Sequence, residues 1–259
     1  RRISCKFKNL LFAALSVLDV RREEAYDARS NPMRILPAQN WGITWGQLDS
    51  LRSQVAARFK RGQENPNVYK VVEDFMRPIC LARHVSYAVL LNPAGKPCDT
   101  FVSHAWSESY LQFVDDIKES CNGFKSRVFW ACFAALPQTW PRGNLSGLLG
   151  INPHQSPFSK AIDHCGSFLV VRNSNKNMYF RLWCVTELAF ASAANKPAQI
   201  VGNMPPSTIT SGADLLSQAT CSEEEDTEIL AHIVEASSVD LAALITKVVQ
   251  APAGSEQDL

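Results

Sequence analysis

The feature that most constrains the fold is an alternation, beginning at Cys98, of short apolar runs with amphipathic segments. The runs have the length and composition of strands, and helical patterns separate them. They cover residues 99–103, 128–136, 168–171, 198–201 and, more weakly, 215–221. Strands that alternate with helices in this way predict an α/β fold with a doubly wound parallel sheet. The continuous apolar run 128–136 is typical of a central strand that is buried on both faces.

The segments before and after this alternating region differ from it in pattern. Residues 1–92 have helical spacing, and Thr44 with Gln47 has the spacing of a capping box. The turn residues of segment 93–97 mark the boundary. We therefore predict a helical N-terminal extension over 1–92, an α/β domain over 93–250 and a disordered polar tail over 251–259.

Composition limits the possible partners and compartments. The chain has 26 basic and 25 acidic residues, so no net field favours nucleic acid. The apolar start around residues 10–18 has helical spacing, which favours an amphipathic helix over a signal peptide. No apolar run approaches the roughly 20 residues that span a bilayer. Eight cysteines occur without close pairs, which favours a reducing compartment, and hence a cytoplasmic location, over a disulfide framework.

Two segments carry the residues that suggest a binding site. Glu187 lies four residues after Trp183, so a carboxylate and an aromatic ring share one face of a helix. The strand ending at Ser103 continues into His104 and Trp106. A strand end and a helix start that offer such groups to one cleft are the usual origin of a small-molecule site in an open α/β fold.

These segments resemble the motifs of Toll/interleukin-1 receptor (TIR) domains. Residues 99–104 read Asp-Thr-Phe-Val-Ser-His, which is similar to the opening box of that family. Residues 183–188 fit the Trp-Cys-x-x-Glu-Leu segment of plant TIR domains and the Trp-x-x-x-Glu pattern of bacterial ones. The resemblance covers about residues 98–250, and it implies a flavodoxin-like sheet of five parallel strands.

The resemblance also implies a function. Many TIR domains cleave the nicotinamide–ribose bond of NAD, and others only assemble signalling complexes. By this resemblance Glu187 is the catalytic residue, Trp183 lines the site, and the loop 139–155 gates or assembles it. NAD is then a substrate rather than a cofactor, and self-association or binding to other TIR domains is expected.

The residue types suit this chemistry. Cleavage of the bond gives the ribose oxocarbenium character, which a carboxylate stabilises. Arg181 is placed to meet a diphosphate, which the fork of a guanidinium fits. Ser103, His104 and Trp106 would line the opposite side of the cleft. His154, His164 and Cys165 lack metal-ligand spacing, so we predict no metal site.

Other interpretations of the same residues stay open. Glu187 could be a helix acid that complements the dipole, and Trp183 could be a core aromatic. Arg181 could form a surface ion pair, His104 a structural hydrogen bond, and Cys184 an inert buried thiol. The chain could also be a non-enzymatic interaction module that uses Trp140 and Arg142, or a hydrolase or transferase of other nucleosides.

Overall fold

The computed structural model describes residues 32–59, 65–120, 123–138, 153–172, 177–203, 211–221 and 224–259. Residues 32–259 form one compact unit. The predicted helix at the start of the chain and most of the predicted loop 139–155 lie outside the described residues.

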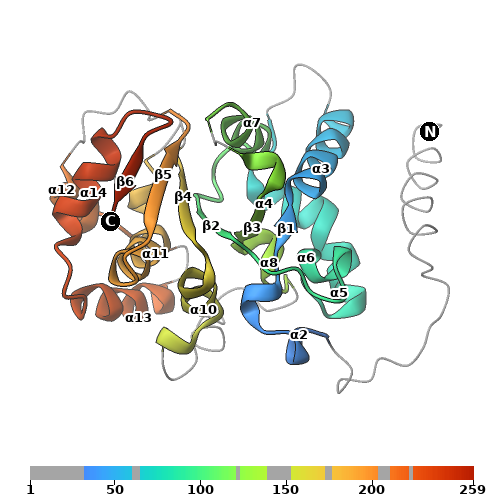
Figure 1. Ribbon diagram of the computed structural model, residues 1–259, viewed down its shortest axis with the longest axis horizontal. Helices are drawn as coiled ribbons and strands as arrows, with labels where there is room; N and C mark the ends of the chain where they lie inside the picture. The colour runs from blue at the N-terminus through green and yellow to red at the C-terminus, as the bar shows by residue number, and fades with distance from the viewer. Residues whose placement is uncertain are drawn as a thin grey trace. The chain divides into compact units, whose positions relative to one another are not determined.

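The unit is built on a mixed six-stranded sheet with the order β1-β3-β2-β4-β5-β6 (Figure 1). The strands are β1 (Ile43–Thr44), β2 (Thr100–Ser103), β3 (Val128–Ala131), β4 (Ser167–Val171), β5 (Pro197–Val201) and β6 (Glu256–Asp258). The four inner strands are parallel, with Val102 opposite Ala131 on one side and opposite Leu169 on the other. The two edge strands are antiparallel. The expected α/β class is confirmed, but four strands are parallel and not five.

Two of the predicted strands differ from the structure. The run 128–136 forms β3 only as far as Ala131 and then turns into α8 (Cys132–Ala135). A short apolar run cannot be assigned to strand or helix by periodicity alone, and alanine favours the helix. The predicted strand 215–221 is wrong, because residues 212–217 form a helix, α12, and only Thr220 makes a bridge, to Arg181.

The tail predicted to be disordered carries the sixth strand. Residues 256–258 pair with β5 opposite Pro197, Ala198 and Gln199. Gly254 has a φ of 81° and donates its amide to Ile200 O, which turns the chain back toward the sheet. Without the tail, β5 would be an edge strand with unpaired backbone N–H and C=O groups. The backbone of residues 256–258 forms hydrogen bonds with these groups. Side-chain composition therefore did not reveal the pairing.

Helices cover both faces of the sheet, and two groups of buried apolar residues correspond to these faces. One group includes Phe101, Phe168 and Ile200, and the other includes Val102, Leu169 and Val201. The helices on the first face are α10 (Pro157–His164), α11 (Leu182–Ala193), α12 (Gly212–Ser217), α13 (Glu224–Glu235) and α14 (Leu241–Gln250). Figure 1 shows α12 and α14 side by side next to β6, and α13 next to α11.

The second face is covered by α7 (Tyr110–Ser120) and by most of the N-terminal elements, which are α3 (Trp45–Arg58), α4 (Val68–Val71), η2 (Val72–Met76), α5 (Arg77–Arg83) and α6 (Tyr87–Leu91). The first two N-terminal elements, α2 (Pro32–Ile35) and η1 (Ala38–Asn40), lie on the first face instead, where η1 packs against α10. The capping box is confirmed: Gln47 N donates to Thr44 Oγ1 at 3.3 Å, and Thr44 N donates to Gln47 Oε1 at 2.9 Å. The predicted boundary near residue 92 does not separate two bodies, because β1 belongs to the sheet and Leu48 packs with Phe129.

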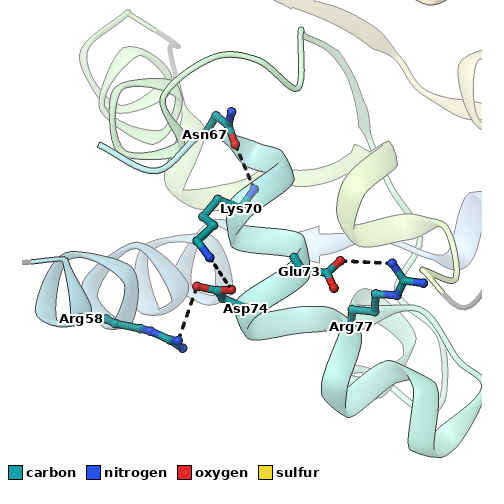
Figure 2. Close-up of polar contacts among 6 residues, drawn as sticks. All are labelled: Arg58, Asn67, Lys70, Glu73, Asp74 and Arg77. Atoms are coloured by element: carbon teal, nitrogen blue, oxygen red, sulfur yellow. Dashed lines mark hydrogen bonds and ion pairs between the residues drawn. The ribbon is translucent and has the colours of Figure 1, made fainter. Parts of the chain in front are cut away.

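The outer side of these N-terminal helices carries a ladder of polar contacts (Figure 2). Asp74 accepts from Lys70 at 3.0 Å and lies 3.5 Å from Arg58, and Glu73 pairs with Arg77 at 3.1 Å. The ladder spans a π-helical turn, Val72–Met76, whose apolar side chains are buried. Ion pairs therefore stabilise the exposed face of this turn, and the burial of apolar side chains stabilises its inner face.

Candidate functional site

The two segments singled out in the sequence meet in the structure. Ser103 is the last residue of β2, and Glu187 lies in the second turn of α11. The hydroxyl of Ser103 donates to Oε2 of Glu187 at 2.6 Å, although 84 residues separate them in the chain. β2 lies between β3 and β4, so the strand order reverses at this strand. The carboxyl end of a strand at such a reversal is where open α/β proteins place their ligands.

The carboxyl group of Glu187 is enclosed by protein, with 4% of the residue exposed. Burial raises its pKa from the usual 4.5 to about 8, and the hydrogen bond from Ser103 acts in the opposite direction. The group is therefore mainly a neutral acid at pH 7. Loss of the proton requires either a higher pH or a positive charge brought close to the carboxyl.

His104 and Glu108 form a second buried pair beside this contact. Nδ1 of His104 lies 2.7 Å from Oε1 of Glu108, and both side chains are almost fully buried. Burial lowers the pKa of His104 to about 3, and burial together with Asp116 raises the pKa of Glu108. His104 is therefore neutral at pH 7, so the contact is a hydrogen bond and not an ion pair.

Two thiols lie next to this pair. The ring nitrogen Nε2 of His104 is 3.8 Å from Sγ of Cys132, which also accepts from Nε1 of Trp106 at 3.0 Å. Cys184 donates its thiol to the backbone oxygen of His104 at 3.4 Å. Burial raises the pKa of both thiols, so each is protonated and unreactive as a nucleophile. His104 and Trp106 thus both contact Cys132, and the charge of Glu187 adds to the effect of burial on the pKa of this thiol.

Trp183 and Arg181 lie at the start of α11. The ring of Trp183 is half-buried and stacks on Phe158 of α10, with centroids 4.7 Å apart and planes 30° apart. Arg181 precedes the helix, bridges to Thr220 through the backbone and lowers the pKa of Cys184 by its charge. The structure therefore places the ring and the guanidinium on the element that carries Glu187, with the ring against the aromatic wall of α10.

Several residues of the site were not found from the sequence. Glu108 could have been found, because it lies only four residues after His104. Tyr179 and Asn177 carry no motif, yet both are buried, and Tyr179 Oη and Asn177 Nδ2 have no hydrogen-bond partner. Burial raises the pKa of Tyr179, and the charges of Cys184 and Glu187 raise it further, so the phenol and the carboxyl interact electrostatically. Buried donors without partners are uncommon and call for an explanation.

A cleft of about 750 Å³ lies elsewhere, between α2 and α10. Its walls include Met33, Trp41, Pro157 and Lys160 and do not include Glu187.

Within the described parts of the chain, no three His, Cys, Asp or Glu side chains cluster as metal ligands would. In the same residues no helix has the length and apolarity needed to cross a membrane.

The chain matches no protein-family model, no curated protein and no solved structure. Its function must therefore be argued from the site itself.

Proposed function

We propose that the chain is a TIR-like NAD+ hydrolase in which Glu187 is the catalytic carboxylate. The observation that carries the proposal is the hydrogen bond from Ser103 to Glu187 at the strand where the sheet order reverses. Taken in chain order, the four parallel strands run 2-1-3-4 across the sheet. This is the beginning of the flavodoxin-like order 2-1-3-4-5. We propose that the fold is a variant of that class in which the antiparallel β6 replaces the fifth strand.

In the proposed reaction Glu187 has one role, which is to stabilise positive charge on the ribose. The bond between the nicotinamide nitrogen and the ribose breaks, nicotinamide leaves neutral, and the ribose gains oxocarbenium character. An ionised carboxylate stabilises that charge. Water then completes hydrolysis to ADP-ribose, or an internal nucleophile gives a cyclic product.

The environment of Glu187 suits a cationic substrate. A nicotinamide ring that carries positive charge favours the ionised form of a nearby acid and lowers its pKa. The half-buried Trp183 supplies a flat apolar wall, and Arg181 at the start of the same helix has a guanidinium of the kind that binds a diphosphate. The described cysteines are free thiols, which fits the proposed cytoplasmic location.

The experiment compares the wild-type protein with Glu187→Gln. Nicotinamide release from NAD+ is measured on protein that has been artificially clustered, because TIR enzymes are often active only when assembled. Glu187→Gln should abolish release while keeping the fold, since the amide oxygen can still accept from Ser103. Glu73→Gln, in the exposed ladder of Figure 2, is the matched control and should keep full activity.

The outcome separates the candidate reactions. Equal nicotinamide release by wild type and Glu187→Gln would remove Glu187 from the mechanism. Release of base from other nucleosides, but not from NAD+, would favour a nucleoside hydrolase or transferase on the same fold.

A second candidate function is favoured by the enclosure of Glu187. A carboxyl that is 4% exposed and neutral at pH 7 can be a structural acid. In that case the chain is a non-enzymatic module that signals by homotypic contacts. No turnover would then occur even in the clustered protein, and self-association would depend on Trp140 and Arg142.

A further inference from the structure

Cys98 and Cys165 lie side by side at the amino ends of β2 and β4, whereas the candidate site lies at the carboxyl end of β2. Cys98 comes shortly before β2, and Cys165 is the C-cap of α10, shortly before β4. Thr100 and Ser167 are register partners in these parallel strands. Cys98 lies two residues before Thr100, and Cys165 lies two residues before Ser167. The two segments therefore run next to each other at the cysteines as well.

The distances suit a covalent bond between them. The two sulfur atoms are 3.3 Å apart. Neighbouring strands are about 4.8 Å apart, which lies within the range of Cα separations that disulfides span. A disulfide bond is about 2.05 Å long, so the sulfurs need to approach by little more than about 1 Å. Rotation of the side chains can supply this without moving the strands.

The two thiols are not equivalent. Cys165 donates its S–H to the sulfur of Cys98. This contact places the sulfur of Cys98 directly against the S–H of Cys165, so we assign Cys98 as the sulfur that reacts first. The same bond and burial raise the pKa of Cys165, which keeps it as the protonated partner. This is the arrangement of an attacking and a resolving cysteine.

We propose that Cys98 and Cys165 form a reversible intramolecular disulfide when the folded protein meets a peroxide. Cys98 attacks hydrogen peroxide, which gives a sulfenic acid and one molecule of water. Cys165 then attacks the sulfur of the sulfenic acid, which forms the disulfide and releases a second molecule of water. The dithiol loses two electrons, and the peroxide gains them. A thiol reductant restores both cysteines by exchange.

The disulfide would join two elements that hold the candidate site at their far ends. β2 ends at Ser103, which donates to Glu187, and α10 carries Phe158, on which Trp183 stacks. The bond would close the chain over residues 98–165 and restrict the unfolded state. Oxidation should therefore raise the thermal midpoint of the protein, whatever reaction the site performs.

The test is peptide mapping of the native wild-type chain after treatment with hydrogen peroxide. Trypsin should release Cys165 in peptide 161–172 and Cys98 in peptide 84–118, since Lys96 precedes a proline. Each of these peptides contains a single cysteine. The expected product is the linked pair, lighter than the sum of its parts by two hydrogen atoms and separated again by dithiothreitol.

Two variants test the order of the steps. Cys165→Ser should leave a sulfenic acid on Cys98 that dimedone traps, whereas Cys98→Ser should give no adduct at Cys165. The proposal is overturned if the wild-type map contains both peptides unlinked after complete reaction of an exposed control thiol, or if either cysteine pairs elsewhere. Mapping of the wild type decides this even if a serine variant fails to fold.

Discussion

Replacement of Glu187 by glutamine should change the way stability depends on pH. The amide keeps the shape of the side chain and can accept from Ser103, but it cannot ionise. In the wild type, burial raises the pKa of Glu187 from 4.5 to about 8, so the folded protein retains a proton that the unfolded chain releases. The folded state then binds more protons than the unfolded state across this window, and the free energy of unfolding falls as the pH rises.

The size of the effect follows from the two pKa values. Each pKa unit corresponds to 1.36 kcal/mol. With 4.5 in the unfolded chain and about 8 in the folded protein, the wild type should lose roughly 3.5 kcal/mol more than the variant between pH 5 and pH 8. Below pH 4.5 the contribution is fully present, and above about pH 8 the difference becomes constant.

Urea unfolding of both proteins at several pH values measures this difference. Glu108, His104 and Asp116 also titrate, but they are present in both proteins, so subtraction removes their contribution. The midpoints should lie close together at pH 5 and separate progressively toward pH 8, with the variant the more stable. Parallel curves across this range would refute the reasoning, because they would mean that Glu187 ionises in the folded protein as it does in water.

Three further predictions follow from named contacts. Ser103→Ala removes the donor that lowers the pKa of Glu187, so the alkaline rise of nicotinamide release should move to higher pH; an unchanged pH–rate profile would contradict the role of this bond. Tyr179→Phe removes a buried hydroxyl that has no hydrogen-bond partner among the described residues, so stability in thermal unfolding should stay equal or increase; a loss of stability would mean that the hydroxyl has a partner. Thr44→Ala removes the capping box of α3 and should cost about 1 kcal/mol in urea unfolding, whereas Ser53→Ala on the exposed side of the same helix should change little.

Local sequence patterns predicted much of the fold. The strands ending at Ser103, Val171 and Val201 lie where apolar runs predicted them, because a buried strand needs a continuous run of apolar side chains. Thr44 and Gln47 form the predicted capping box at the start of α3, because their side chains satisfy backbone amides that a helix start leaves free. In each case the interactions that decide the structure lie within a few residues.

The errors arose where the deciding interaction is distant. The run 128–136 is equally apolar on both sides of Ala131, and only packing makes one half a strand and the other a helix. The polar tail pairs with β5 through its backbone, which composition does not describe. Residues 32–92 join the same unit because β1 completes the edge of a sheet whose other strands come later in the chain.

The candidate site divides in the same way. The sequence by itself determined which residue types are available: an acid one turn after a tryptophan, and a serine at a strand end. Only the tertiary structure decided that Ser103 donates to Glu187, that His104 pairs with Glu108, and that Glu187 and His104 are mainly neutral at pH 7. A pKa depends on how much solvent and charge surround a group, and that environment exists only after distant segments have packed together.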